Sequence, residues 1–479
     1  MKKFISIKAL LILMLVVSGT SCSDDETNTT PTSVDFAITP EAVEFGSTGG
    51  HRMINVHINP GTEWTLTNTA DWLSIEETSG AGMAHFNFIA APNETQEERT
   101  TTVTASNGSQ NINVQVKQSA TASTEFVYDI TPDPSNMSDM SSVAFAQAMG
   151  TGWNLGNTLE AIGGETAWGN PMASQTLING VKAAGFNTIR IPVAWSTFSD
   201  AANYTIDPTW MARVQEVVDY AISIDMYVIM NEHWDGGWMQ PTYAQQDYVN
   251  DRLAKMWKQI ATHFRDYDYH LIFAGTNEVM VEGDYGTPTA EYYTVQNSFN
   301  QTFITTVRAT GGRNAYRYLA VQGFNTNINH TVNFAQMPDD VTADRMLMEV
   351  HFYDPYNFSL NAESTITQWG ANATDPNLTE TWADESYVDA QFQSMKTNFT
   401  DNGIGVILGE YGAISRTDVP GHQAFRLDWV SYVSNSAREH GLVPVWWDNG
   451  LPYNNNSMGI FDRNTGAVTD TDIVNAILD

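Results

Sequence analysis

The feature that most constrains this chain is an alternation of apolar strand-like segments with helical segments over residues 141–479. Two of the helical segments have clear start signals, because Ser174 precedes "QTLINGVKAAG" and Asp207-Pro208 precedes "TWMARVQEVVDYAI". Eight strands, each followed by a helix, predict an α/β fold of the (β/α)8 TIM-barrel type. A doubly wound sheet usually has fewer strands, and the sequence has no glycine-rich phosphate loop. The predicted strands cover residues 150–158, 186–193, 226–233, 271–278, 318–325, 345–353, 405–412 and 442–449.

Residues 34–120 have a different pattern. They alternate in short pieces such as "MINVHINP" and "AHFNFIA", with Asn107-Gly108 as a hairpin turn and no helical period. This predicts a small all-β sandwich. The stretches "EWTLTNTADWLSI", "APNETQEERTTTV" and "VQVKQSA" resemble the BACON domain of bacterial surface proteins, which implies either carbohydrate binding or a spacer. Trp64 and Trp72 are expected to be core residues and not sugar platforms.

The segments outside these two domains are short. Residues 1–21 combine a positive start, an apolar run and small residues, which is typical of a secretory signal and is too short to span a bilayer. Residues 22–33 are expected to form a tether, and residues 121–140, with Pro132-Asp133-Pro134, a linker to the predicted barrel at 141–479.

Cys22 is the only cysteine, so the mature chain can form no internal disulfide. Its position after "SGTS" resembles the acylated cysteine of bacterial lipoproteins, and the acidic run after it resembles a surface-export tag. This resemblance implies a lipid anchor at the outer membrane, facing outward, with each buried methylene contributing roughly 0.8 kcal/mol. Simple secretion is the alternative.

The formal charge of −33 limits the partners of this chain. Such a surface repels phosphate groups, so nucleic acid and anionic headgroups are poor partners, and any membrane contact would run through the anchor. A neutral or cationic substrate is expected.

Polar residues follow seven of the eight predicted barrel strands. In a TIM barrel the carboxyl ends of the strands and their loops meet at one face, where reacting groups gather. The fifth strand contributes no candidate. The candidates are Asn157, Arg190, His233, Asn277, Glu278, His351, Tyr353, Glu410 and Trp447.

Two of these residues form a pair with a clear chemical meaning. Glu278 follows the fourth strand and Glu410 the seventh, so both face one barrel mouth. A retaining glycosidase needs two carboxyl groups about 5–5.5 Å apart, one as nucleophile and one as acid and base. The pair therefore predicts hydrolysis of a glycosidic bond, without a cofactor.

Several ordered motifs support this interpretation. "GWNLGNTLEA", "ETAWGNP", "FNTIRIPVAW", "FAGTNE", "EVHFYDPYNF", "ILGEYG" and "WWDNG" resemble glycoside hydrolase family 5, subfamily 4, the endo-β-1,4-glucanases, over residues 140–479. The resemblance implies that Glu278 is the acid/base and Glu410 the nucleophile.

The same resemblance implies roles for the neighbours. Arg190 and the Tyr353 hydroxyl would contact the nucleophile and favour its ionised form, while Glu278 keeps its proton. Asn277 would bond the sugar 2-hydroxyl, and His233, His351 and Trp447 would border the same sugar.

Other tryptophans are candidate sugar platforms, namely Trp168, Trp234 and Trp238. The sequence also departs from the family here. It has His233-Trp234-Asp235 where relatives usually have His-His-Asp, and Glu232 where they have an apolar residue. This departure puts any fine substrate preference in doubt.

Alternatives are weaker but remain open. His233 with Asp235, or His351 with Asp354, lacks a third metal ligand at a helical or hairpin spacing, so no metal is expected. No G-x-S-x-G elbow supports a serine hydrolase. Within the family the polymer is undecided between cellulose, mixed-linkage glucan and xyloglucan, with xyloglucan favoured. A β-mannanase and a non-catalytic glycan-binding protein are the competing functions.

Overall fold

A computed structural model describes residues 36–121, 126–233 and 236–479. The predicted signal, the tether and Cys22 lie outside these residues. Among the described residues, no helix has the length and apolar character needed to cross a bilayer.

The first domain is a sandwich of two sheets, with strand orders β1-β3-β7-β5 and β2-β9-β8-β4-β6. Alternate residues of its strands point into one apolar core, in which Trp64 is 2% exposed. Trp72 packs partly buried against that core, under the Arg99 guanidinium. The predicted sandwich is confirmed. Its strands are β1 (Ala37–Thr39), β2 (Ala42–Phe45), β3 (Gly50–His57), β4 (Glu63–Thr67), β5 (Leu73–Ile75), β6 (Ser79–Ala81), β7 (Ala84–Ala90), β8 (Arg99–Ser106) and β9 (Asn111–Gln118).

The hairpin between β8 and β9 lies where the sequence predicts it. The Asn107 side-chain carbonyl accepts hydrogen bonds from the backbone N–H groups of Ser109 and Gln110. Gly108 has φ +83°, a conformation that glycine adopts without strain. The Asn-Gly pair therefore sets the register of the two longest paired strands in this sheet.

The second domain is a closed barrel of eight parallel strands, and the predicted TIM barrel is confirmed. The barrel closes because β10 pairs with both β11 and β17. All eight strands are almost entirely buried, as expected for strands covered on both faces. They are β10 (Gly152–Leu155), β11 (Thr188–Ile191), β12 (Tyr227–Asn231), β13 (Leu271–Ala274), β14 (Leu319–Asn327), β15 (Met346–Phe352), β16 (Gly405–Tyr411) and β17 (Leu442–Asp448).

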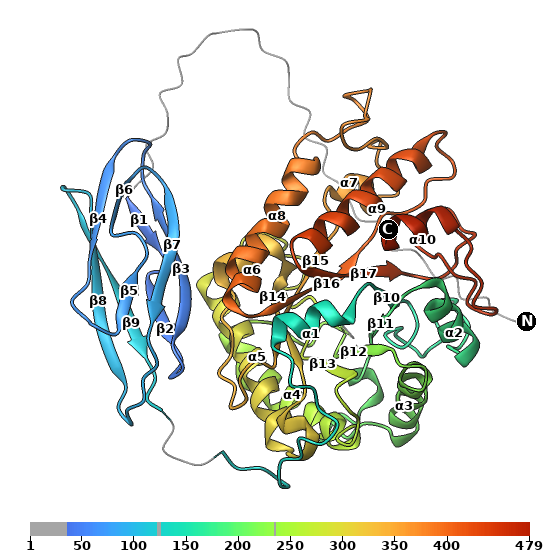
Figure 1. The fold of residues 1–479 in the computed structure, drawn as a ribbon, viewed down its shortest axis with the longest axis horizontal. Helices are drawn as coiled ribbons and strands as arrows, with labels where there is room; N and C mark the ends of the chain where they lie inside the picture. The colour runs from blue at the N-terminus through green and yellow to red at the C-terminus, as the bar shows by residue number, and fades with distance from the viewer. Residues whose placement is uncertain (1–35, 122–125, 234–235) are drawn as a thin grey trace, which may run out of the picture.

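Helices form a ring outside the barrel strands (Figure 1). The predicted caps are present, because Ser174 accepts a hydrogen bond from the N–H of Leu177 and Asp207 from that of Thr209. The helices are α1 (Ser142–Met149), α2 (Gln175–Ala184), α3 (Pro208–Ile222), α4 (Tyr243–His263), α5 (Ala290–Ala309), α6 (Ile328–Phe334), α7 (Tyr356–Ser359), α8 (Glu385–Asn398), α9 (His422–Glu439) and α10 (Thr471–Leu478).

The second half of the predicted linker is packed on the barrel. The N–H of Asp129 donates to the carbonyl of Ala309, and the N–H of Asp133 donates to that of Gly312. These backbone bonds give residues 126–140 a fixed path that their proline-rich composition does not reveal.

Candidate active site

The predicted site residues lie at the carboxyl end of the barrel, but several strands end sooner than the sequence predicts. β12 ends at Asn231 and β13 at Ala274, so His233 and Glu278 lie on the loops that follow. Arg190, His351, Glu410 and Trp447 remain on strands. Loop residues are free of the strand hydrogen-bond ladder, so their side chains can turn into the mouth of the barrel.

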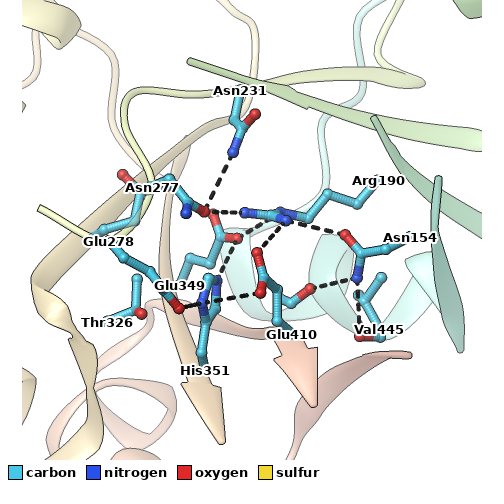
Figure 2. A network of polar contacts seen from close by, with 12 residues as sticks. Asn154, Arg190, Asn231, Asn277, Glu278, Thr326, Glu349, His351, Glu410 and Val445 are labelled. Atoms are coloured by element: carbon cyan, nitrogen blue, oxygen red, sulfur yellow. Dashed lines mark hydrogen bonds and ion pairs between the residues drawn. The ribbon is translucent and has the colours of Figure 1, made fainter. Parts of the chain in front are cut away.

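Glu410 is buried and held from two sides. Its Oε1 lies 2.8 Å from Nη1 of Arg190, and its Oε2 accepts a hydrogen bond of 3.0 Å from the Tyr353 hydroxyl. Arg190 is fully buried, and Figure 2 shows its guanidinium between Asn277, Glu410 and Asn154. A charge-assisted hydrogen bond from a guanidinium in a buried site fixes the carboxylate in one orientation.

Burial has the largest effect on the ionisation of Glu410, and it raises the pKa of this carboxyl. His351 and Arg190 act in the opposite direction, and Glu278 adds to the rise. The two cations therefore do not depress the pKa below its usual range, as the sequence alone suggested. They limit the cost of burying the anion, so ionisation of Glu410 depends on them.

Glu278 has a more open environment. Its side chain is 38% exposed, and its Oε1 lies 2.7 Å from Nδ1 of His351. Oxygens of Glu278 and Glu410 lie within 4.8 Å of one another. This spacing fits the short separation of a retaining pair and is well below the roughly 6.5–9.5 Å of an inverting pair.

His351 connects the two carboxylates. Burial alone would lower its pKa, but the carboxylates around it, Glu410 foremost, outweigh burial and raise its pKa to about 9. His351 is therefore an imidazolium at neutral pH. Its Nδ1 lies 3.7 Å from Oε2 of Glu410 and also contacts Glu278. One positive charge is therefore shared by the two carboxylates.

The hydrogen-bond network shows which end of the Asn277 side-chain amide is the oxygen and which is the NH2 group. Its Oδ1 accepts from Nη2 of Arg190 at 2.6 Å, and arginine can only donate. The carbonyl end of Asn277 is therefore fixed, which makes its NH2 group the end that can donate to a sugar hydroxyl (Figure 2).

The same reasoning sets the tautomer of His233. Asn231 accepts from the N–H of Val193 through its Oδ1, so its Nδ2 donates to Nδ1 of His233 at 3.1 Å. Burial, with Arg190 and His351 nearby, holds the pKa of His233 well below its usual value. His233 is thus neutral with its proton on Nε2.

The predicted aromatic residues divide into three groups. The Trp447 ring is half-buried and nearly parallel to that of His233, with centroids 6.0 Å apart. Trp168 is 41% exposed on the loop after β10. Trp238 is 9% exposed beneath Arg252, so its prediction as a sugar platform is wrong. Trp234 lies outside the described residues.

Asn157 lies at the mouth in a left-handed conformation with φ +54°. Its N–H donates to Glu160, and its carbonyl accepts from Nδ2 of Asn170. These contacts hold the turn after β10. Among the described residues, no hydrogen bond or ion pair joins the Asn157 side chain to Glu278 or Glu410, so its role in substrate binding stays a prediction.

The structure adds residues that sequence reasoning missed. Asn154 accepts from Arg190, and Glu349 forms an ion pair with it at 2.8 Å. The fifth strand, for which no candidate was predicted, contributes Thr326 and Asn327 to the cavity beside Glu278. Thr326 has φ +47°, a rare conformation for a β-branched residue and a mark of local strain. A polar residue inside an otherwise apolar strand was the available signal for Glu349.

That cavity has a volume of about 670 Å³, and Glu278, His351 and Tyr353 are among the residues that line it. Two exposed tyrosines border it, Tyr285 at 72% and Tyr356 at 59% exposed. Aromatic rings beside an open cavity offer flat faces on which sugar rings can pack.

Glu278, His351 and Glu410 also form the one group among the described residues with the composition of a cation site. Arg190 and the His351 imidazolium already place positive charge against these carboxylates. A further cation would meet that charge, so the arrangement fits acid–base chemistry better. The expectation of no metal stays a prediction.

Comparison with known proteins identifies the family. The cellulase family, glycosyl hydrolase family 5, matches residues 153–451. A xyloglucan-specific endo-beta-1,4-glucanase of Bacteroides ovatus is 40% identical over 95% of this chain and 93% of its own length. The chain belongs to glycosyl hydrolase family 5.

Solved structures of family 5 agree with this membership. A Bacteroides ovatus xyloglucanase bound to a XXXG heptasaccharide has 40% identity and a TM-score of 0.72, with coverage of 93% of this chain and 99% of that one. A Paenibacillus pabuli xyloglucanase has 41% identity and a TM-score of 0.67, covering 69% and 98%. Residues 62–119 match the BACON family, described as a putative N-terminal binding domain. The resemblances to family 5 and to the BACON domain are confirmed.

Proposed function

We propose that this family 5 enzyme is a retaining endo-β-1,4-glucanase, with Glu410 as nucleophile and Glu278 as acid/base. Endo-acting hydrolysis of β-glucans follows from the family and its relatives. The observation that carries the assignment of roles is an asymmetry. Glu410 is buried and held by Arg190 and Tyr353, whereas Glu278 lies within 4.8 Å of it at the rim of the cavity.

The proposed reaction has two steps. In the first, an oxygen of ionised Glu410 forms a bond to the anomeric carbon as the bond to the leaving oxygen breaks, and Glu278 gives its proton to that oxygen. In the second, Glu278 takes a proton from water, whose oxygen bonds to the anomeric carbon and releases Glu410 as a carboxylate. Two inversions leave the configuration unchanged.

The neighbours have matching roles in this scheme. The Asn277 NH2 group donates to the sugar 2-hydroxyl, an interaction that strengthens in the oxocarbenium-like transition state. Nε2–H of neutral His233 is a second donor at the same sugar. Trp447 supplies an apolar floor beneath the ring, because sugar C–H faces pack on aromatic rings.

Xyloglucan is the proposed polymer. Similar family members from Bacteroides ovatus and Paenibacillus pabuli are xyloglucanases. The cavity of about 670 Å³ beside Glu278 supplies room for a branched chain on the leaving-group side, with Tyr285 and Tyr356 as packing faces. A linear glucan or a mannan does not need that width.

The test is reducing-sugar release by the purified mature protein from xyloglucan, mixed-linkage glucan, carboxymethyl cellulose and glucomannan, side by side. The proposal predicts the highest kcat/KM on xyloglucan. A higher value on glucomannan would favour the β-mannanase alternative. Binding without release on all four would favour a glycan-capturing protein.

Surface attachment is a separate proposal. Cys22 is expected to carry the lipid that holds the enzyme at the outer membrane, and the strongly acidic surface leaves that anchor as the membrane contact. In cells, the wild-type protein should sediment with membranes and be shed by added protease. The variant Cys22→Ala should appear in the medium, and a variant that stays membrane-bound would remove the anchor from the account.

A further inference from the structure

Glu349 is a third carboxylate in the site, and it contacts no open part of the cavity. It lies on β15, two residues before His351, so both side chains point to the same face of the strand. Glu349 is fully buried. A buried charge is costly unless it is paired, so its partners define what it does there.

One oxygen of Glu349 lies between two cations. Oε1 is 2.8 Å from Nε of Arg190 and 3.4 Å from Nε2 of His351 (Figure 2). These are the cations that hold the two reacting carboxylates, since Arg190 contacts Glu410 and His351 contacts Glu278. Like Glu410, Glu349 therefore lies against both cations, but unlike Glu410 it is fully enclosed by the protein.

The second carboxylate oxygen of Glu349 is held by a side chain from a neighbouring strand. Oε2 accepts a hydrogen bond of 2.7 Å from the Gln322 amide, whose own carbonyl accepts from the N–H and hydroxyl of Thr276. The carboxylate also packs against β16, because a Cβ built on Gly409 would lie 2.1 Å from Oε1 of Glu349. Gly409 directly precedes Glu410. The position of Glu349 is therefore set by β14, β16 and the loop that follows β13.

We propose that Glu349 is a positioning residue, which holds Arg190 and His351 in the orientation and charge state that the two reacting glutamates need. The proposal rests on the proposed function of this site. Glu349 touches neither substrate nor the reacting atoms, and it acts through the two cations.

The charge of Glu349 also supports its proposed role as a positioning residue. Burial by itself raises the pKa of Glu349, but Arg190 and His351 outweigh it and bring the pKa to about 2. Glu349 is therefore an anion at every working pH. Its charge helps to raise the pKa of both Glu410 and His351. The groups that face it are Arg190, His351, Gln322 and Glu410, with Tyr353 and Glu278 beyond them.

The test compares Glu349→Gln with Glu349→Asp on the polymer that the wild type cleaves best. Glu349→Gln should lower kcat by about 100-fold with KM little changed, because a small misplacement of the reacting groups is enough for such a loss. Loss of the negative charge should also lower the pKa of both Glu410 and His351. Both limbs of the pH profile should therefore move to lower pH.

Glu349→Asp keeps the charge but shortens the side chain. It should lower kcat while leaving the pH limbs near their wild-type positions, which separates charge from geometry. Asp340→Asn is the matched control, because it breaks another buried arginine–carboxylate pair, with Arg308, far from the carboxylates. It should lower Tm but leave kcat and the pH profile unchanged.

Wild-type kcat and unchanged pH limbs in Glu349→Gln would overturn the proposal. If that variant does not fold, Glu349→Asp carries the test, and full kcat there would overturn it equally. The failure of the proposed function looks different, because the wild type itself would then release no sugar.

Discussion

Glu410 and Glu278 lie on two walls of the active site, and the two side chains are held in opposite ways. We call the surroundings of Glu410 the buried wall and those of Glu278 the open wall. On one wall, Glu410 is 5% exposed and bound by Arg190 and Tyr353. On the other, the Glu278 side chain is 38% exposed and borders an open cavity. A nucleophile must keep one orientation and stay ionised, whereas an acid/base must exchange protons with a leaving group and then with water. The difference in burial therefore supports the two roles that we propose.

The first prediction concerns a variant that lacks the carboxylate of the buried wall. Glu410→Ala should lower polysaccharide hydrolysis by a factor on the order of 10⁶, the size seen when an enzyme loses its nucleophile. Binding of the polymer should persist, because the aromatic surfaces are untouched. Added azide should restore some turnover and give a product of inverted configuration. Activity close to wild type would exclude Glu410 as the nucleophile.

The second prediction addresses the open wall. Glu278→Gln should slow polysaccharide cleavage by about 10²–10⁴-fold, the usual contribution of a general acid. The first step should survive with an aryl glycoside whose leaving group needs no proton, so a burst of phenol followed by slow turnover is expected in stopped-flow absorbance. Equal losses on both substrates would show that the two walls do not differ in role.

The third prediction weakens one support of Glu410. Tyr353→Phe removes the hydroxyl that donates to Oε2 at 3.0 Å, a bond to a charged group that contributes about 1.5–3 kcal/mol. That bond favours the ionised form, so its loss should raise the pKa of Glu410. The acid limb of kcat/KM should move to higher pH while the alkaline limb stays in place. A shift of the acid limb to lower pH would contradict this account.

The smallest effect concerns His351, which contacts both walls. Its pKa is raised from 6.5 to about 9 in the folded state. A raised pKa stabilises the folded protein fully below pH 6.5, and this contribution is lost as the pH rises through 9. The Tm advantage of the wild type over His351→Gln should therefore shrink between these values, as measured by calorimetry. An advantage that grows with pH would mean that His351 is neutral.

Much of the barrel is predictable because its strands are buried on both faces and appear as apolar runs. The helix starts at Ser174 and Asp207 are equally local, since a capping side chain bonds within three residues. The proximity of Glu278 and Glu410 could also be predicted, because both glutamates directly follow or end such runs. Their order in the chain then places them at one mouth.

Other features depend on contacts between distant segments, and the sequence does not reveal them. Trp238 is buried because Arg252 from α4 covers it. The raised pKa of Glu410 reflects how deeply the fold buries it, which no motif records. Glu349 was overlooked because its partners Arg190 and Gln322 come from other strands, although a charge inside "MLMEVHF" was visible. Thr326 is placed by a left-handed turn within β14 that its residue type disfavours.

The most direct test of the central claim is to trap the glycosyl enzyme with a 2-deoxy-2-fluoro β-glucoside carrying a good leaving group. Mass spectrometry of the digested protein then locates the sugar. The account predicts one added sugar, on the peptide that contains Glu410. A sugar on Glu278, or no adduct together with an inverted product, would contradict the assignment of the two walls.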